Sequence, residues 1–190
     1  MIIKQSLADY IKTIIFLTDE QLALVLERFK YEKFQKHALL VNEGQVSKHM
    51  NFIVKGCLRI FFIKEDGQET TRHLAFEQQF ATGLASFITE SPSFEYIQAM
   101  EETETLRINR KDFYYLLNVI PAWEKFYRNY LENAYINNLQ IFQREITKDA
   151  ELRYRELLER NPEVVQRLSN KVVASYLNMS PETLSRIKSR

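Results

Sequence analysis

Residues 168–188 read LSNKVVASYLNMSPETLSRIK, a pattern typical of two short helices joined by a tight turn. Val173 and Leu177 are four residues apart, so they share one helix face. Asn178 tolerates the left-handed conformation that ends a helix, and Ser180 is a favourable cap for the helix that follows. This stretch therefore predicts a helix-turn-helix.

The second helix of this motif has a polar face suited to a DNA major groove. Opposite the apolar Leu184 and Ile187, the helical spacing places Glu182, Ser185, Arg186 and Ser189. Glu182 and Arg186 are also spaced for an i, i+4 ion pair. The alternative is an ordinary helical hairpin. We predict that the DNA-binding residues are Ser180, Glu182, Thr183, Ser185, Arg186, Lys188 and Lys171.

The distribution of charge favours the DNA-binding interpretation. The whole chain of 190 residues has a formal net charge of only +1. Residues 148–190, by contrast, contain nine Lys and Arg against six Asp and Glu. A positive end on an otherwise neutral protein is typical of phosphate binding, although basic C-terminal segments are also common.

Composition predicts a folded protein of one or two domains, because 45% of the residues are hydrophobic and 13% are aromatic. A single cysteine, Cys57, excludes an internal disulfide and a cysteine cluster for zinc or iron–sulfur binding. Charges interrupt the apolar residues 1–17, and no apolar run is long enough to span a bilayer. We therefore expect a cytoplasmic protein with no membrane partner and no cofactor.

The first two thirds of the chain combine helices and short strands. Residues 6–29 have a helical pattern, with capping-box spacing at residues 18–21. Asp66 and Gly67 form a two-residue hairpin signal within a segment rich in β-branched and aromatic residues. We expect strands at residues 50–55, 57–64, 69–75, 97–100 and 105–108. Short strands at such regular spacing favour a β-sandwich or jelly roll.

A long helix is expected at residues 121–147, after a shorter one that Asn109 caps. The long helix has two apolar stripes, more than a surface helix needs. One stripe consists of Trp123, Tyr127, Tyr130, Ala134 and Ile141, and the other of Leu131, Tyr135, Leu139, Phe142 and Ile146. Complete burial in the chain's own core is one interpretation. We favour a homodimer that uses the first stripe, because major-groove readers usually work as symmetric pairs.

This order of elements resembles that of the catabolite-activator (Crp/Fnr) family of bacterial transcription regulators. The stretch NFIVKG at residues 51–56, with Asp66-Gly67 after it, resembles the family's cyclic-nucleotide-binding-type β domain. The stretches ASYL at residues 174–177 and PETLSRI at residues 181–187 resemble the branch common in Bacteroidetes. The resemblance implies an α+β fold with an N-terminal jelly roll, a long dimerisation helix and a C-terminal winged helix-turn-helix with a reduced wing.

The resemblance also implies domains and partners. Residues 1–120 would be an effector domain, residues 121–147 the dimerisation helix and residues 148–190 the DNA-binding domain. DNA, a second copy, RNA polymerase and an unknown small-molecule effector would be the partners of a regulator that is not an enzyme. In the family a Glu and an Arg four residues later contact base edges, and these match Glu182 and Arg186. The family's Arg before that Glu is replaced by Pro181, so we expect a different half-site.

The effector cassette departs from the cyclic-AMP-binding members of the family. Those members have a Glu for the ribose and an Arg for the phosphate, where this chain has Gly83 and Ser93. Glu90 and Glu95 would repel a phosphate, so we do not expect cyclic AMP to bind in the family's manner. We assign to a candidate effector pocket Gly83, Leu84, Ala85, Ser86, Ser93 and Phe94.

Two other functions are compatible with parts of the sequence. A jelly roll can be a cupin that holds a metal, but His37, His49 and His73 are not at ligand spacing in one motif. The other alternative is an interaction module whose helix-turn-helix no longer binds DNA. Retention of Glu182 and Arg186 argues against this second alternative.

Overall fold

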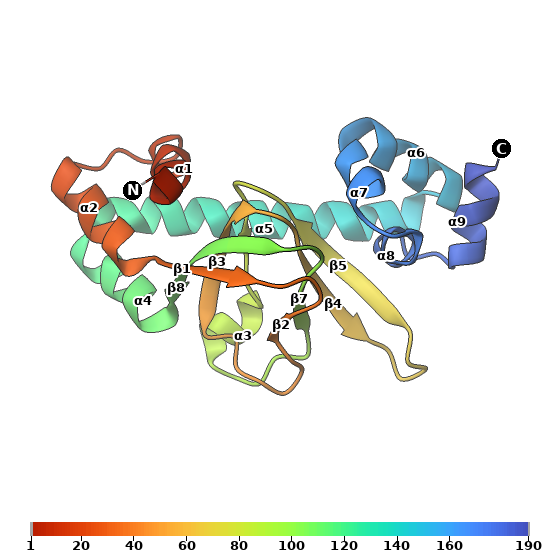
Figure 1. The fold of residues 1–190 in the computed structure, drawn as a ribbon, viewed down its shortest axis with the longest axis horizontal. Helices are drawn as coiled ribbons and strands as arrows, with labels where there is room; N and C mark the ends of the chain where they lie inside the picture. Colours follow the sequence, from red (N-terminus) through yellow and green to blue (C-terminus); the bar gives the residue numbers. More distant parts are fainter. Residues whose placement is uncertain (1, 190) are drawn as a thin grey trace. The chain divides into compact units, whose positions relative to one another are not determined.

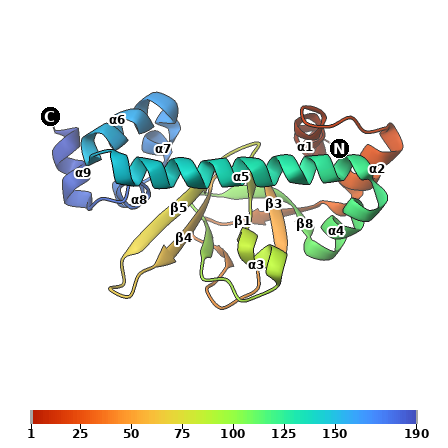
Figure 2. The same cartoon turned by 180° about the vertical axis from the view of Figure 1, so that it is seen from behind.

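The computed structural model describes residues 2–189, and Figures 1 and 2 show its helices and strands. The first two helices are α1 (Ile2–Lys12) and α2 (Asp19–Arg28). The β region contains β1 (Lys30–Phe34), β2 (Leu39–Val41), β3 (His49–Lys55), β4 (Leu58–Ile63), β5 (Glu69–Ala75), β6 (Phe80–Ala81), α3 (Leu84–Thr89), β7 (Tyr96–Ala99) and β8 (Thr103–Asn109). The helices that follow are α4 (Arg110–Val119), α5 (Pro121–Thr147), α6 (Ala150–Arg160), α7 (Pro162–Arg167), α8 (Asn170–Tyr176) and α9 (Pro181–Lys188).

The chain divides into two compact units that differ from the three predicted domains. The first unit comprises Met1–Ile60 and Leu74–Asn133, and the second comprises Phe61–His73 and Ala134–Arg190. The division therefore crosses α5 in its middle, and it places the tip of the β4–β5 hairpin with the C-terminal helices. Sequence spacing did not indicate that the hairpin tip belongs with these helices, because 74 residues separate the end of β5 at Ala75 from the start of α6 at Ala150.

The strands form two sheets, as the prediction of a jelly roll requires. Within the described residues, the sheet orders are β1-β8-β3-β6 and β2-β7-β4-β5. Strands β3 and β8 pair antiparallel, with Phe52 opposite Leu106. On the other side of β8, Tyr31 of β1 is also opposite Leu106. The predicted α+β class and the jelly roll are confirmed. The five predicted strands end within two residues of the predicted ends, whereas β1, β2 and β6 were not predicted as strands.

The turn of the β4–β5 hairpin lies where Asp66-Gly67 predicted it, but it is longer than predicted. The Lys64 N–H donates to the Gln68 carbonyl at 2.9 Å, so three residues rather than two form the loop. The Gly67 N–H donates to the Lys64 carbonyl at 2.8 Å, and Gly67 has a φ of +81°. A type I turn followed by a left-handed glycine is the usual three-residue hairpin loop.

The core of the first unit joins helices to one sheet. It contains apolar residues of α1, α2, α4 and the first half of α5, packed against β3, β6 and β8. Trp123 and Phe126 of α5 are buried there, with stacked rings whose centroids are 4.3 Å apart. Phe126 also makes an edge contact with Phe80 at 5.8 Å. The first half of α5 is therefore an internal helix of this unit.

The second unit is built around a smaller apolar core. Helices α6, α7, α8 and α9 gather around the second half of α5 (Figures 1 and 2). Their buried apolar residues are Leu157, Val164, Leu168, Val172, Val173, Ala174, Leu177 and Leu184. The described residues that follow α5 form helices and no strand, so the predicted reduced wing is not present in residues 148–189.

Candidate nucleic-acid interface

The helix-turn-helix consists of α8 and α9, and side chains cap both helices, although the sequence predicted only the cap at Ser180. The Ser169 hydroxyl accepts from the Val172 N–H at 3.4 Å, which satisfies an orphan donor of the first turn of α8. The Ser180 hydroxyl accepts from the Thr183 N–H at 3.1 Å and donates to the Thr183 hydroxyl at 3.2 Å. Asn178 has a left-handed φ of 49°, which turns the chain between the helices. Ser180 and Thr183 thus hold the start of α9.

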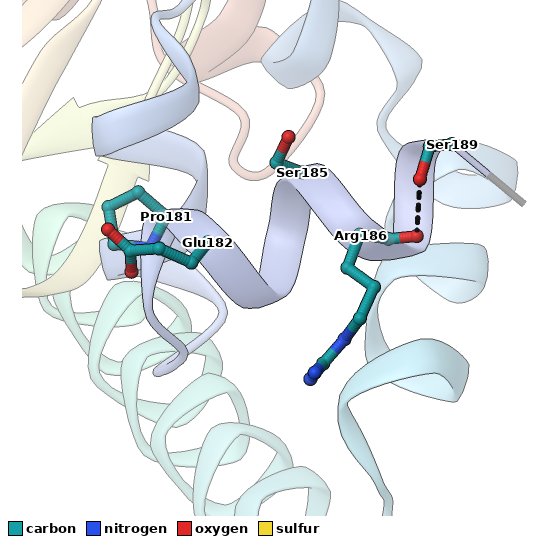
Figure 3. A pocket seen from close by; sticks show the side chains of 5 residues that line it. All are labelled: Pro181, Glu182, Ser185, Arg186 and Ser189. Carbon is teal, nitrogen blue, oxygen red and sulfur yellow. Dashed lines mark hydrogen bonds between the residues drawn. The ribbon is translucent and has the colours of Figure 1, made fainter.

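A polar face of α9 is exposed to solvent, and Figure 3 shows the side chains that line it. The residues that line this shallow hollow are Pro181, Glu182, Ser185, Arg186 and Ser189. Leu184, on the opposite face, is fully buried. The Arg186 side chain forms no hydrogen bond or ion pair with another described residue. Because a guanidinium carries five N–H donors in a planar fork, this face can offer paired donors to a ligand.

The predicted ion pair between Glu182 and Arg186 is not formed. Figure 3 shows the Glu182 carboxylate beside Pro181, whereas the Arg186 guanidinium extends away from it. The backbone N–H of Glu182, and to a smaller extent the Ser180 side chain, lower the pKa of Glu182. The first turn of a helix has unpaired N–H groups and a positive dipole end, which attract a carboxylate. The helix start holds Glu182 ionised and leaves Arg186 without this partner.

The two lysines predicted to contact DNA have partners within the chain. The Lys188 ammonium donates to the Asn170 side chain at 2.6 Å and lies 5.9 Å from the centre of the Tyr154 ring. The Lys171 ammonium lies 3.8 Å from the Glu69 carboxylate, while 74% of the Lys171 side chain stays exposed. Exposed contacts of this kind are weak, so a DNA phosphate could replace either one.

Two arginines outside the predicted site hold the turn of the helix-turn-helix. Arg144 of α5 donates to the Tyr176 carbonyl at 3.4 Å, and its guanidinium lies 5.1 Å from the centre of the Tyr176 ring. Arg153 of α6 donates to the Asn178 carbonyl at 3.4 Å and to the Lys148 carbonyl at 3.1 Å. Cations at a helix C-terminus satisfy its last carbonyls. Spacing could not reveal these roles, because the partners are distant in sequence.

Three of the residues predicted for an effector pocket are buried in a hydrogen-bond network at the start of α3. The Gly83 N–H donates to the Ser47 hydroxyl at 3.3 Å, and the Ser47 N–H donates to the Ser86 hydroxyl at 3.0 Å. The Ser93 hydroxyl donates to the Glu95 carbonyl and accepts from the Glu95 N–H, each at 3.0 Å. A Cβ added at Gly83 would lie 3.2 Å from the Ser47 Cβ. A larger residue at position 83 would therefore require Ser47 to move.

The remaining predicted pocket residues lie elsewhere on the surface. Leu84 is half-buried, whereas Ala85 and Phe94 are exposed. The six predicted residues therefore differ in exposure, since Gly83, Ser86 and Ser93 are buried. Chain order placed these residues together, but it did not indicate which of them the fold would cover.

The stripe of α5 predicted to form a dimer lies largely against the protomer itself. Trp123 is fully buried in the core of the first unit, and Tyr127 and Tyr130 pack against that core. Ala134 and Ile141 are half-buried. The assignment of Trp123 to a dimer interface is therefore wrong, because a side chain covered by its own protomer cannot contact a second copy.

The other apolar stripe of α5 is the exposed one. Leu131 of this stripe is half-buried, whereas its other four side chains are exposed by 49–66%, namely Tyr135, Leu139, Phe142 and Ile146. Positions 135, 139, 142 and 146 repeat at alternating intervals of four and three residues. This is the spacing of the apolar seam of a two-stranded coiled coil.

Residues 2–189 contain neither a cluster of metal ligands nor a membrane-spanning helix. In that range, no three His, Cys, Asp or Glu side chains gather as ligands for a metal ion. No helix described in the structure combines the length and the apolar character needed to cross a membrane.

Comparisons with known proteins agree with the fold. Residues 31–119 match the family described as the cyclic nucleotide-binding domain. FixK2 from Bradyrhizobium japonicum has a TM-score of 0.75 at 14% identity, over 85% of this chain and 83% of that one. A Crp/Fnr-family transcriptional regulator from Eubacterium rectale has a TM-score of 0.69 at 17% identity, over 90% of this chain and 82% of that one.

A third similar structure is that of CLP, a c-di-GMP responsive global regulator from Xanthomonas campestris. It has a TM-score of 0.73 at 14% identity, over 90% of both chains. A search of curated proteins found no match. At these identities the likeness concerns the fold, which is that of Crp/Fnr-type transcription regulators with a cyclic-nucleotide-binding-type jelly roll and a long helix after it.

Proposed function

We propose that this chain is a sequence-specific DNA-binding transcription regulator whose α9 enters the major groove. The observation that carries the proposal is the open polar face of α9, on which Arg186 has no partner among the described residues. An arginine on a recognition helix can donate two hydrogen bonds to guanine O6 and N7. Glu182, held ionised at the start of the helix, can accept from a cytosine amino group. Pro181 has no N–H to donate, so it adds no base contact of that kind.

The regulator acts as a homodimer in this proposal, and α5 supplies the contact through its exposed stripe. Two copies that pair through Tyr135, Leu139, Phe142 and Ile146 would be related by a two-fold axis. Their recognition helices would then meet two half-sites about 34 Å apart along the duplex. Residues 1–120 would serve as the effector domain, residues 121–147 as the dimerisation helix and residues 148–190 as the DNA-binding domain.

The β domain would respond to an unknown small molecule. That molecule would not be cyclic AMP held as other members of the family hold it. The buried hydroxyls of Ser47, Ser86 and Ser93 already bond within the chain, to the Thr82 hydroxyl, the Ser91 carbonyl and the Glu95 carbonyl respectively. A desolvated phosphate needs a charge-assisted partner, and Ser93 stands where the family has arginine. The proposal includes RNA polymerase as a partner in the cytoplasm, and membership of the Bacteroidetes-type branch.

A comparison of two arginine variants tests the reading of bases by Arg186. Fluorescence anisotropy would measure the affinity for a labelled duplex selected by the wild-type protein and for a duplex of random sequence. Arg186→Ala should weaken binding to the selected duplex by about 1–3 kcal/mol and change binding to the random duplex much less. Arg128→Ala is the matched control, because Arg128 is an exposed arginine of α5 that faces only Glu132, at 3.9 Å. Equal losses on both duplexes would reduce Arg186 to a phosphate contact.

A further inference from the structure

Ser175, on the helix that precedes the recognition helix, forms a set of hydrogen bonds with the β4–β5 hairpin. Its hydroxyl donates to the Glu69 carbonyl at 2.9 Å and accepts from the Thr71 N–H at 2.9 Å. The Thr71 hydroxyl is also 2.9 Å away. A serine hydroxyl has one donor and two acceptor sites, so the third bond requires the Thr71 hydroxyl to donate. All three of these bonds join the Ser175 hydroxyl to residues of β5.

Strand β5, which carries Thr71, lies at an edge of its sheet. β5 stands at the end of the sheet order β2-β7-β4-β5, so one side of its backbone has no neighbouring strand. Unpaired backbone groups of an edge strand are free to bond with another element. Thr71 is buried, and a buried N–H without a partner would be costly. The Ser175 hydroxyl therefore covers the edge of β5 where Thr71 lies.

Neighbouring side chains reinforce this contact at both ends of α8. Lys171, one helical turn before Ser175, lies 3.8 Å from the Glu69 carboxylate. At the other end, Arg144 donates to the Tyr176 carbonyl at 3.4 Å. The contact leaves the polar face of α9 exposed, so it does not block the surface proposed to bind DNA.

We propose that Ser175 is a positioning residue, which fixes the helix-turn-helix on the edge of β5 in the orientation that presents α9 to DNA. This inference rests on the proposed function and adds the contact that sets the position of the DNA-binding helices. β5 runs from the second unit into the first at Leu74, so the strand that holds α8 is continuous with the β domain. Within the second unit, the contact would set the position of α8, and with it that of α9, on the residues of β5 that belong to the same unit.

The test uses variants on both sides of the contact in the full chain. Ser175→Ala removes the shared hydroxyl, Thr71→Val removes the facing hydroxyl at constant shape, and Ser175→Thr restores a hydroxyl. Ser6→Ala is the matched control, because the Ser6 hydroxyl donates only locally, to the Ile3 carbonyl of α1. Anisotropy would measure the affinity for the duplex selected by the wild-type protein over a range of salt concentrations. Hydrogen exchange would measure the protection of the Thr71 amide.

Ser175→Ala should bind the selected duplex about five- to tenfold more weakly, which corresponds to the loss of one or two net hydrogen bonds. The salt dependence should not change, because no phosphate contact is removed. The Thr71 amide should exchange faster, and Ser175→Thr should recover most of both effects. Combining Ser175→Ala with Thr71→Val should cost little more than Ser175→Ala alone, because the two groups act as one unit.

The inference would be overturned if Ser175→Ala bound the selected duplex as tightly as the wild-type protein and Ser6→Ala do. The proposed function would be left intact by that result. Additive losses in the double variant would overturn the inference as well, because the two hydroxyls would then act separately. A wild-type protein that bound no duplex would defeat the proposed function, and the positioning role would fail with it.

Discussion

Replacing Phe142 with alanine should weaken the self-association of this chain through α5. The Phe142 side chain is 62% exposed in the protomer and lies at the centre of the exposed stripe, between Leu139 and Ile146. Alanine preserves the helix, because it has the highest helix propensity. The substitution therefore removes apolar area from the proposed interface without disturbing the core that holds Trp123.

The size of the effect follows from the exposed fraction. Complete burial of a large apolar side chain is worth about 1.5–3 kcal/mol, so burial of the exposed part of Phe142 contributes about 1–2 kcal/mol. A two-fold dimer buries this side chain twice, which gives about 2–4 kcal/mol. The dimer dissociation constant should therefore rise by about 30- to 1,000-fold.

Sedimentation equilibrium over a range of concentrations would measure this constant. Phe16→Ala is the matched control, because Phe16 is 86% exposed, in the loop between α1 and α2, and belongs to no apolar stripe. The control should dimerise as the wild-type protein does. A wild-type protein that is monomeric at micromolar concentration, or a Phe142→Ala variant with the wild-type constant, would refute the assignment of the dimer to this stripe.

Three further outcomes can be measured on the same protein. Lys171→Ala should weaken binding to all duplexes alike and lower the slope of log affinity against log salt by about one, measured by anisotropy titration; a loss confined to one sequence would contradict a phosphate contact. Calorimetry with cyclic AMP should detect no binding at low micromolar concentration, and a clear low-micromolar isotherm would show that Gly83 and Ser93 do not prevent recognition. Burial, with a smaller contribution from the charge of Arg72, lowers the pKa of His73 from its usual 6.5 to about 4. Between pH 4 and pH 6.5 the folded state then binds fewer protons than the unfolded state. The free energy of unfolding, measured by denaturant titration, should therefore be highest above pH 6.5 and fall by up to about 3 kcal/mol as the pH drops towards 4. The variant His73→Gln should lack this pH-dependent component.

Local chemistry explains why much of the fold could be predicted. The cap at Ser180, the left-handed residue Asn178 and the uninterrupted helix at residues 121–147 depend on neighbours in the chain, and the structure has all three. The hairpin turn at Gly67 was predicted in place but with the wrong loop length. The choice of turn type depends on how the two strands pair, which a dipeptide does not determine.

The features that were predicted wrongly depend on tertiary partners. A helical wheel identified two stripes on α5 but not which one the first unit would cover, so Trp123 was assigned to the wrong surface. Glu182 and Arg186 have the spacing of an ion pair, yet the start of α9 holds the carboxylate instead. The bonds of Ser47 to Gly83, and of Ser175 to β5, join residues whose proximity only the fold reveals.

Selection of DNA from a random duplex library by the purified full chain tests the central claim most directly. The account predicts enrichment of a sequence with two-fold symmetry, whose half-sites have centres about 10 base pairs apart and contain a guanine that Arg186→Ala no longer requires. Sequencing of the bound pool would give both the symmetry and the base preference. A pool that stays random after repeated rounds, or one whose base preferences are identical for the wild-type protein and Arg186→Ala, would contradict recognition of DNA by α9.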